Sequence, residues 1–533
     1  MANGDIFSGL TRGIPGVTPR DMKAPAASFE SPDRIRAAGS VQYTPDKFFL
    51  GVMDADIQRD ENTGERYAQN GIEIGVATDQ HAITIAGSRA GKGRAAILPN
   101  MLRYAGSAIA IDPKGELARE TARTRAETIG QRVCILDPFG VTGTDLEEFQ
   151  VGFNPLAILH VDSPTLVIDC GLIADALTIV AGNDPHWDES ARSFLELLLL
   201  HVVSYYGYEG RRNLVTLRDV MLRGTTIQSG EMIATGFDGL QREIEHNVLL
   251  LQADAEDAEN FEHSERIAEL AVLIEGAAAD FFDKGDRERA SVLSTARRQL
   301  KFLDYPQLRR SLSPSDDDEF SLTQLKTEPG GMSVYMCLPA GRMGTCARWF
   351  RLFINLALEA MERTPGKPAT GCPVLFVLDE FATLGHMRQI EDAAGQIAGF
   401  GVKLWPILQD LGQLKALYKD RWETFMGNAG ILQFFGNNDL TTLEWVSKRL
   451  GKTTMEQLSG STATPDAKAK GTLQTGQSYS PQAVSVMEPD EIALVFGRPD
   501  AYLRQLVIRS GYAPMILQRA YYDKHKAFTG SGT

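Results

Sequence analysis

Phosphate-binding residue types are concentrated in one short stretch of the chain. The apolar run 81–86 leads into the loop Gly87-Ser88-Arg89-Ala90-Gly91-Lys92-Gly93-Arg94, and the residues that follow are compatible with a helix. A small-residue loop between a strand and a helix directs backbone N–H groups and the helix N-terminus at phosphates, and its lysine reaches the outer phosphates. This stretch therefore predicts a nucleoside triphosphate site.

Two positions of the loop depart from the general pattern GxxxxGK[ST]. Ala86 occupies the place of the first glycine, which is acceptable if its φ is negative. Gly93 replaces the hydroxyl residue that usually ligates Mg²⁺, so water or another side chain would have to fill that position. Pro99 is expected to kink the following helix. Taken alone, the loop is also compatible with a ligand-free, glycine-rich connection.

Two adjacent carboxylates, Asp379 and Glu380, end a second apolar run at 374–378. In a nucleoside triphosphatase the first acid holds Mg²⁺ through its water shell, and the second accepts a proton from the attacking water. The alternative is a buried strand that simply ends in solvated acids. The phosphate loop upstream favours the catalytic interpretation.

A third polar residue, Gln409, ends the apolar run 402–408. An amide at the tip of a strand beside the phosphate loop can sense the γ-phosphate or orient the water. Many strands end in glutamine, however, and Pro406 argues against a fully hydrogen-bonded central strand. Gln409 is a sensor candidate only in combination with the other two motifs.

The elements that would position these residues alternate along the chain. Several predicted strands are continuous apolar runs, which is typical of parallel strands covered on both faces. Helical stretches at 346–363 and 387–398 lie between strands, so the predicted fold class is α/β with helices on both sides of the sheet. The predicted strands are 82–86, 107–111, 133–136, 332–338, 374–378, 402–408, 431–435 and 503–508.

Between residues 188 and 303 this alternation gives way to amphipathic helices, with no strand expected between them. The pattern predicts an all-alpha domain inserted into the α/β domain. Acids far outnumber bases from 253 to 286. A solvated helix face explains such a run, and recruitment of basic cargo is the alternative. The predicted helices are 191–206, 241–251, 264–282 and 289–303.

The remaining segments have simpler patterns. Residues 1–45 are rich in proline and small residues, which predicts an extended arm, and a hairpin is expected from 48–52 and 71–76. The Ser-, Thr- and Gly-rich segment 459–481 is expected to be a mobile loop. The predicted division is an arm (1–45), a motor domain in two parts (46–187 and 304–525), the insertion (188–303) and a tail (526–533).

Composition limits the classes of function. The net charge of −15 excludes a generally basic nucleic-acid coat, so DNA contact would need a local patch. Five cysteines without a CxxC pair suit a reducing compartment. No run approaches the ~20 apolar residues of a membrane-spanning helix, and the chain is expected to be soluble. Candidate DNA-contacting residues are Lys114, Arg119, Arg123, Arg125, Arg297, Arg298 and Lys301.

These motifs together resemble the TraG/TraD-like family, the conjugative coupling ATPases of type IV secretion systems. The resemblance covers about residues 45–525 and rests on the phosphate loop and the acid pair, together with further segments in the same order. Those segments are Ile97-Leu98-Pro99-Asn100-Met101-Leu102, Ala110-Ile111-Asp112-Pro113-Lys114-Gly115-Glu116-Leu117, Leu136-Asp137-Pro138-Phe139, Phe153-Asn154-Pro155-Leu156 and Glu488-Pro489-Asp490-Glu491-Ile492.

The resemblance implies a RecA-like P-loop NTPase motor related to FtsK and HerA, with the insertion as the family's all-alpha domain. It implies ATP and Mg²⁺ as cofactors and a homo-hexamer with sites between subunits. By the same resemblance Lys92 binds the β- and γ-phosphates and Asp379 serves the metal, while Glu380 is the base and Gln409 the sensor. Arg388 is a weak candidate for an arginine that acts in trans.

The resemblance also implies partners and a location. Relaxase or effector cargo, single-stranded DNA and type IV secretion channel components are the expected partners, at the cytoplasmic face of the bacterial inner membrane. Members usually begin with transmembrane helices, so this chain is expected to be a soluble variant, with a separate membrane anchor protein as one route to the membrane. Two alternatives stay open: a nucleotide-controlled docking platform, or a HerA-like DNA translocase outside secretion.

Overall fold

The computed structural model describes residues 27–179, 185–229, 232–314, 320–460 and 477–529. These residues form two compact units. The first unit contains residues up to Asn100 together with Ile407–Trp422 and the chain from Ala429 onward. The second unit contains Met101–Pro406 and Glu423–Asn428.

A mixed sheet organises the first unit, with strand order β4-β1-β17-β16-β13-β5. The phosphate-loop strand β5 runs parallel to β13, whereas the other neighbouring pairs are antiparallel. The predicted hairpin is present as the antiparallel pair β1–β4, with a small ribbon of β2 (Ile57–Arg59) and β3 (Arg66–Ala68) between them. The strands of the sheet are β1 (Phe48–Met53), β4 (Ile72–Val76), β5 (His81–Ala86), β13 (Ala429–Phe435), β16 (Arg504–Arg509) and β17 (Met515–Gln518).

A parallel sheet organises the second unit, with strand order β12-β11-β6-β10-β7. Almost every residue of these strands is buried, as their continuous apolar runs predicted. The strands are β6 (Ala108–Asp112), β7 (Arg132–Leu136), β10 (Met332–Cys337), β11 (Val374–Leu378) and β12 (Val402–Leu408).

Strand β12 tolerates Pro406 because its partner changes there. Residues up to Pro406 pair with β11, and Ile407 and Leu408 pair with β5 in the first unit. The missing N–H of proline therefore falls where one ladder stops and the other begins.

Nearby residues explain how the helices after strands β5 and β6 begin. The chain after the loop starts as a π-helical turn, Gly93–Ile97, and continues as α3 (Leu98–Arg103), so the expected Pro99 distortion takes the form of a wider turn. Asp112 accepts a hydrogen bond from the Ala118 N–H at the start of α4 (Glu116–Arg123), and burial raises the pKa of this carboxyl to about 6.

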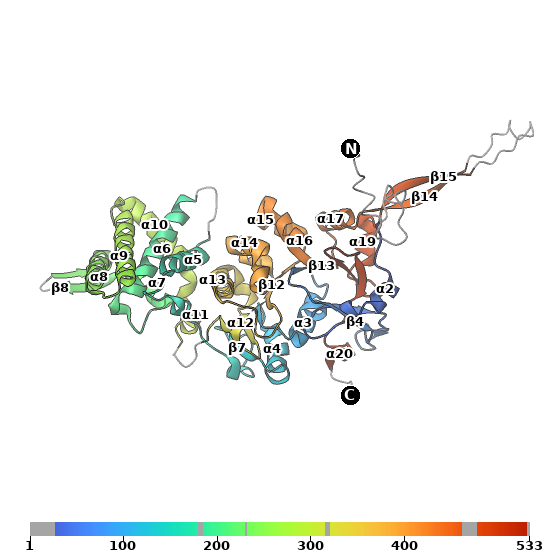
Figure 1. The fold of residues 1–533 in the computed structure, drawn as a ribbon, viewed down its shortest axis with the longest axis horizontal. Coiled ribbons are helices and arrows are strands. Elements are labelled where there is room, and N and C mark those ends of the chain that lie inside the picture. Colours follow the sequence, from blue (N-terminus) through green and yellow to red (C-terminus); the bar gives the residue numbers. More distant parts are fainter. Residues whose placement is uncertain (1–26, 180–184, 230–231, 315–319, 461–476, 530–533) are drawn as a thin grey trace, which may run out of the picture. The chain divides into compact units, whose positions relative to one another are not determined.

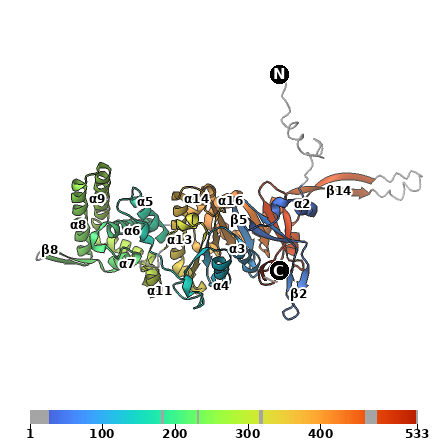
Figure 2. The same cartoon turned by 60° about the horizontal axis from the view of Figure 1, so that its bottom comes forward.

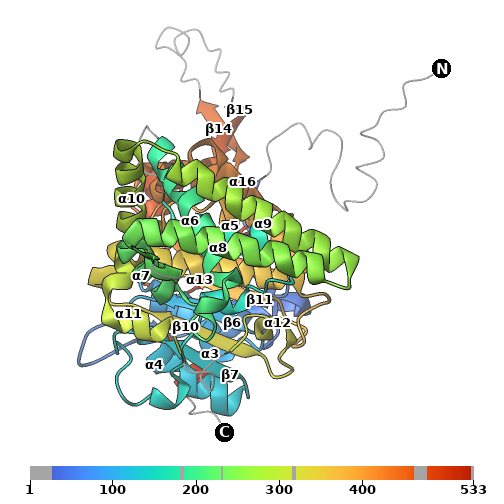
Figure 3. The same cartoon turned by 90° about the vertical axis from the view of Figure 1, so that its left-hand side faces the viewer.

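The predicted helices of the insertion are all present in the second unit. Figure 3 shows α8 and α9 as two long helices side by side. The expectation that no strand interrupts this region is wrong, because β8 (Thr225–Ser229) and β9 (Met232–Thr235) form a short hairpin against α8 (Figures 1 and 2). The helices are α6 (His186–Ser204), α7 (Leu214–Arg223), α8 (Gly236–Asp257), α9 (Phe261–Phe282) and α10 (Asp286–Gln299).

A buried polar network joins α6 to α8. His201 Nε2 lies 3.0 Å from Glu243 Oε1, which also accepts a hydrogen bond from the Tyr208 hydroxyl. Burial lowers the pKa of His201. Because each buried group has a hydrogen-bonding partner, this network fixes the register of the two helices instead of weakening their packing.

Several predicted loop segments are more ordered than expected. Within the arm, α2 (Pro32–Ala37) buries Ile35, while residues 1–26 lie outside the described residues. The ends of the predicted mobile loop belong to a ribbon of β14 (Lys452–Gly460) and β15 (Gln477–Ser485), and 461–476 lie outside the described residues. The tail begins with α20 (Lys526–Thr529). The domain boundaries given above stay a prediction.

No helix among the described residues combines the length and the apolar character needed to cross a membrane.

Candidate functional site

The phosphate loop begins where β5 ends. Ala86 is a strand residue and is absent from the positive-φ positions, so its place in the motif is compatible with alanine. Gly87 donates its N–H to the Phe435 carbonyl at 3.1 Å, which ties the start of the loop to β13. The turn is made by Arg89 and Gly91, with φ of 57° and 88°. A non-glycine residue in this left-handed region costs energy and is typical of ligand-binding loops.

A second chain segment supports the loop at very short range. A Cβ atom added at Gly87 would lie 1.9 Å from the Gly436 carbonyl oxygen, so only glycine fits there. Gly436 in turn donates its N–H to the Phe496 carbonyl at 2.7 Å. The backbone after β13 is therefore a direct structural support for the phosphate loop.

Lys92 and Gly93 stand at the start of the helix that follows the loop. Lys92 has right-handed helical φ and ψ and precedes the π-helical turn. A Cβ at Gly93 would meet no atom within 4 Å, which leaves room for water at the position of the usual hydroxyl ligand. Arg94 forms ion pairs with Glu65 and Asp523 at 2.6 and 2.7 Å, so its guanidinium is engaged within the protein.

Gln409 belongs to the same unit as the phosphate loop. Leu408 pairs with Ile85 in the parallel β12–β5 ladder, so Gln409 follows its strand beside the residue that starts the loop. The Gln409 N–H donates to Gln413 Oε1 at 3.0 Å, and its carbonyl accepts from Asn437 Nδ2 at 3.2 Å. The backbone of the predicted sensor is therefore fixed from two sides.

The acid pair lies in the second unit, at the end of β11. Both Asp379 and Glu380 are partly exposed. Glu380 has φ 51° and ψ 40°, a left-handed conformation that is strained for glutamate, and donates its N–H to Asp379 Oδ1 at 2.9 Å. Thr383 holds the Glu380 carbonyl with its N–H and its hydroxyl, each at 2.8 Å. The backbone that carries the two neighbouring carboxylates is therefore held by local hydrogen bonds.

The structure places the other basic candidates in different settings. Arg388 is exposed at the start of α14 (Arg388–Gln396), and its role stays a prediction. Arg125 is fully buried and donates to backbone carbonyls of Met101 and Gly106, so its inclusion among DNA-contacting residues was wrong. Lys114 is exposed.

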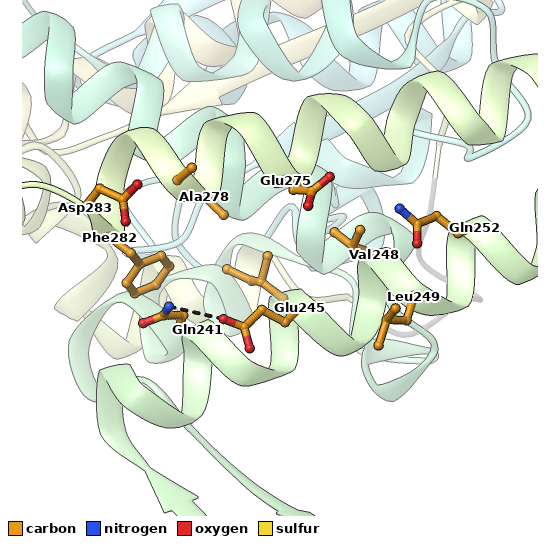
Figure 4. A pocket seen from close by; sticks show the side chains of 11 residues that line it. Gln241, Glu245, Val248, Leu249, Gln252, Glu275, Ala278, Phe282 and Asp283 are labelled. Carbon is orange, nitrogen blue, oxygen red and sulfur yellow. Dashed lines mark hydrogen bonds between the residues drawn. The ribbon is translucent and has the colours of Figure 1, made fainter.

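A groove between α8 and α9 is the main hollow of the acidic region (Figure 4). It has a volume of about 350 Å³ and an apolar floor that includes Ile244, Val248 and Phe282. Its carboxylates come from Glu245, Glu275 and Asp283, all exposed. Leu249, which lines it too, is 62% exposed. All acids of the predicted run are exposed, namely Asp254, Glu256, Asp257, Glu259, Glu262, Glu265, Glu269, Glu275, Asp280, Asp283 and Asp286.

Comparison with known sequences identifies the family of this chain. Residues 50–532 match the sequence model of the family described as type IV secretory system conjugative DNA transfer. The chain belongs to this family. The resemblance inferred from the motifs is thereby confirmed for nearly the whole chain.

The relatives of this chain are distant in sequence and longer. The conjugal transfer protein TraG of Escherichia coli is 26% identical over 424 residues, which cover 77% of this chain and 61% of TraG. Protein VirD4 of Rhizobium radiobacter is 27% identical over 440 residues, which cover 80% of this chain and 56% of VirD4. The chain therefore matches less than two thirds of the length of either relative.

The fold is also similar to that of a protein of known structure. The plasmid coupling protein TrwB, in complex with ADP and Mg²⁺, superimposes with a TM-score of 0.52 at 15% identity, covering 83% of this chain and 85% of TrwB. At this identity the likeness concerns the fold alone. The predicted α/β, RecA-like P-loop NTPase fold is confirmed.

Two residues beside the candidate site do not belong to any motif recognised in the sequence. Gly436 and Asn437 contact the phosphate loop and the Gln409 carbonyl, respectively. Gly436 follows a predicted apolar strand directly, as Asp379 and Gln409 do, and Asn437 is the next residue. A systematic search for small and polar residues at strand ends would have found them.

Proposed function

We propose that this chain is an ATP-hydrolysing coupling protein that moves a DNA–protein or protein substrate into a type IV secretion or conjugation channel. The observation that carries the proposal is the phosphate loop in the first unit. Its turn at Arg89 and Gly91 is followed by Lys92 at a helix start, and Gln409 follows the neighbouring parallel strand. Loops of this construction bind the phosphates of nucleotides.

The proposed reaction is Mg²⁺-dependent hydrolysis of ATP, with each motif in a separate role. Lys92 holds the β- and γ-phosphates, Glu380 accepts a proton from the attacking water, and Gln409 orients that water. The residues fit the metal, because Mg²⁺ needs only one or two carboxylates besides phosphates and water. Asp379 supplies the carboxylate, and the open space at Gly93 accommodates water. Bound Mg²⁺ would neutralise charge on the phosphates.

The proposed output is mechanical, and the partners follow from the family. The protein would act as a homo-hexamer at the cytoplasmic face of the inner membrane, with single-stranded DNA, relaxase or effector cargo and channel components as partners. A separate anchor protein is one proposed route to the membrane. Contact with DNA would require local basic patches, because the chain carries a net charge of −15.

A steady-state ATPase assay with and without single-stranded DNA tests this proposal. We expect the full chain to hydrolyse ATP and single-stranded DNA to raise the rate at least about fivefold, with the stimulation falling as salt is increased because phosphate contacts release counterions. ATP binding with hydrolysis that is negligible and insensitive to DNA would contradict the motor. That result would instead support the docking platform, which the missing hydroxyl at Gly93 favours.

The acidic groove between α8 and α9 is the proposed site for cargo. An apolar floor with carboxylates at its edge is complementary to a basic amphipathic helix, whose apolar face would cover the floor. The exposed Leu249 adds apolar contact area beside this floor.

Charge reversal at the groove tests cargo recruitment. We expect the triple substitution Glu245→Lys, Glu275→Lys and Asp283→Lys to weaken binding of a Leu/Arg amphipathic peptide at least about tenfold in fluorescence anisotropy, while ATPase activity is unchanged. The matched control reverses Asp254, Asp257 and Glu269, exposed acids of the same helices that do not line the groove. If both triple variants lose the same peptide affinity, general electrostatic attraction explains the binding and the groove is not the cargo site.

A further inference from the structure

Arg94 ends the predicted phosphate loop, but its guanidinium group is occupied by other parts of the first unit. Its Nε and Nη2 donate to the two carboxylate oxygens of Asp523 at 3.0 and 2.7 Å, and its Nη1 donates to Glu65 Oε1 at 2.6 Å. The guanidinium carbon also lies 4.4 Å from the centroid of the Tyr521 ring. A planar group that is held on three sides in this way has little freedom to serve as a phosphate ligand.

The two carboxylate partners of Arg94 come from segments outside the loop. Glu65 directly precedes β3 in the short β2–β3 ribbon, whereas Asp523 belongs to the C-terminal segment that follows β17. Residues 64–66 of the ribbon and 89–91 of the loop line the same cavity of about 580 Å³, so open space separates part of the ribbon from the loop. The ion pair between Glu65 and Arg94 is a direct connection of the ribbon to the helix that follows the loop.

The C-terminal segment also fixes the backbone on both sides of Lys92. Arg519 Nη1 donates to the carbonyl of Ala90 at 3.0 Å, two residues before the lysine. The N–H of Tyr522 donates to the carbonyl of Arg94 at 3.0 Å, two residues after it. The position of the lysine therefore depends on contacts made by its neighbours with a segment more than 400 residues away in the sequence.

We infer that Arg94 is a positioning residue of the nucleotide site, and that Glu65 and Asp523 hold it in place and thereby slow the release of bound nucleotide. The inference rests on the proposed nucleotide binding and extends it to the control of nucleotide release. Lys92 touches the phosphates in the proposed site, whereas Arg94 acts through the helical turn that carries Lys92. Loss of the two carboxylates frees this turn, so the lysine is held less firmly against the phosphates.

The sign of the effect separates positioning from simple electrostatics. Glu65 and Asp523 are negative groups close to a site for a polyanion, so Coulomb repulsion alone predicts that neutralising them slows nucleotide release. Positioning predicts the opposite, because neutralisation removes the ion pairs that hold Arg94. The side chains of the three residues are between 31 and 38% exposed, and ion pairs with this exposure each have a modest effect.

Stopped-flow dissociation of a fluorescent ADP analogue from the full chain tests this inference. We expect Glu65→Gln and Asp523→Asn each to raise the dissociation rate constant about threefold, and the double variant to raise it about tenfold. Both substitutions keep the shape of the side chain and remove only its charge. The number of binding sites per chain should stay the same, whereas a partly unfolded variant would lose sites.

The matched control is Asp33→Asn, which neutralises an exposed acid of α2 in the same unit. Asp33 forms an ion pair with Arg36 at 2.6 Å, outside the contacts of Arg94. Its ADP dissociation rate should equal that of the unmodified chain. A conservative variant provides a further measurement: Arg94→Lys keeps the positive charge but cannot bind both oxygens of Asp523 in the same way, so its dissociation rate should lie between those of the unmodified chain and Arg94→Met.

The outcomes separate this inference from the proposed function. Unchanged or slower ADP release in the double variant would overturn the inference, because the two carboxylates would then act through their charge alone or not at all. Equally fast release in Asp33→Asn would overturn it too, since any loss of negative charge would then have the same effect. If the unmodified chain binds no ADP analogue, the proposed function itself fails, and the inference fails with it.

Discussion

Replacing Lys92 with alanine should abolish ATP hydrolysis and weaken ATP binding at least about 100-fold. In the proposed function this lysine holds the outer phosphates, and charge-assisted contacts of this kind are about twice as strong as neutral hydrogen bonds. A 100-fold loss corresponds to roughly 2.8 kcal/mol of binding free energy. Fluorescent nucleotide titration and phosphate release would measure the two effects.

The matched control for Lys92 is Lys448→Ala, which removes an exposed lysine of α17 (Leu440–Leu450) in the same unit. Its ATP binding and ATPase activity should equal those of the unmodified chain. Retention of more than about a tenth of the activity in Lys92→Ala would mean that the loop is not the catalytic phosphate site. In that case its geometry would serve only the connection between β5 and the following helix.

Replacing Glu380 with glutamine should leave ATP binding nearly intact and strongly reduce the rate of hydrolysis. We expect ATP binding within about threefold of the unmodified chain and a fall in kcat of at least about 100-fold, because a general base contributes 10²–10⁴-fold and an amide cannot accept the proton. Glutamine retains the shape of glutamate, so the left-handed backbone at this position is unchanged. Equilibrium titration and single-turnover hydrolysis would measure the two quantities.

Asp392→Asn serves as the control, since it neutralises another acid of the same unit, on α14, outside the acid pair. Its kcat should stay close to that of the unmodified chain. Normal turnover in the Glu380→Gln variant would contradict the catalytic role. Asp379 and Glu380 would then be two solvated acids at the end of a strand.

The strands could be predicted because burial on both faces leaves a direct trace in the sequence. Val374–Leu378 and Ala108–Asp112 are buried throughout, and apart from Asp112 all of these residues are apolar, as burial on both faces favours. The strand–loop–helix geometry of the candidate phosphate loop was predictable for a related reason: it is formed by residues that are neighbours in the chain. Local constraints of this kind are visible without a structure.

Contacts between residues far apart in the chain could not be predicted from the sequence. Arg125 looks like a surface cation in the sequence, yet it is buried because the carbonyls of Met101 and Gly106 surround it. Arg519 is buried for the same reason. Its hydrogen-bond acceptors are the carbonyls of Ala90, which is far away in the sequence, and Leu503, which belongs to no recognised motif. The β8–β9 hairpin escaped prediction because it is short and lies among strongly amphipathic helices, whose pattern dominates the region.

The close approach of Gly87 and Gly436 has a mechanical consequence. No side-chain atom separates the two backbones, so there is nothing between them that could rotate or compress to absorb a displacement. Movement of the phosphate loop must therefore be passed on to the segment after β13, and from there through the Gly436–Phe496 hydrogen bond to the end of α19 (Pro489–Val495). The two glycines form a rigid contact that links the phosphate loop to the C-terminal part of the unit.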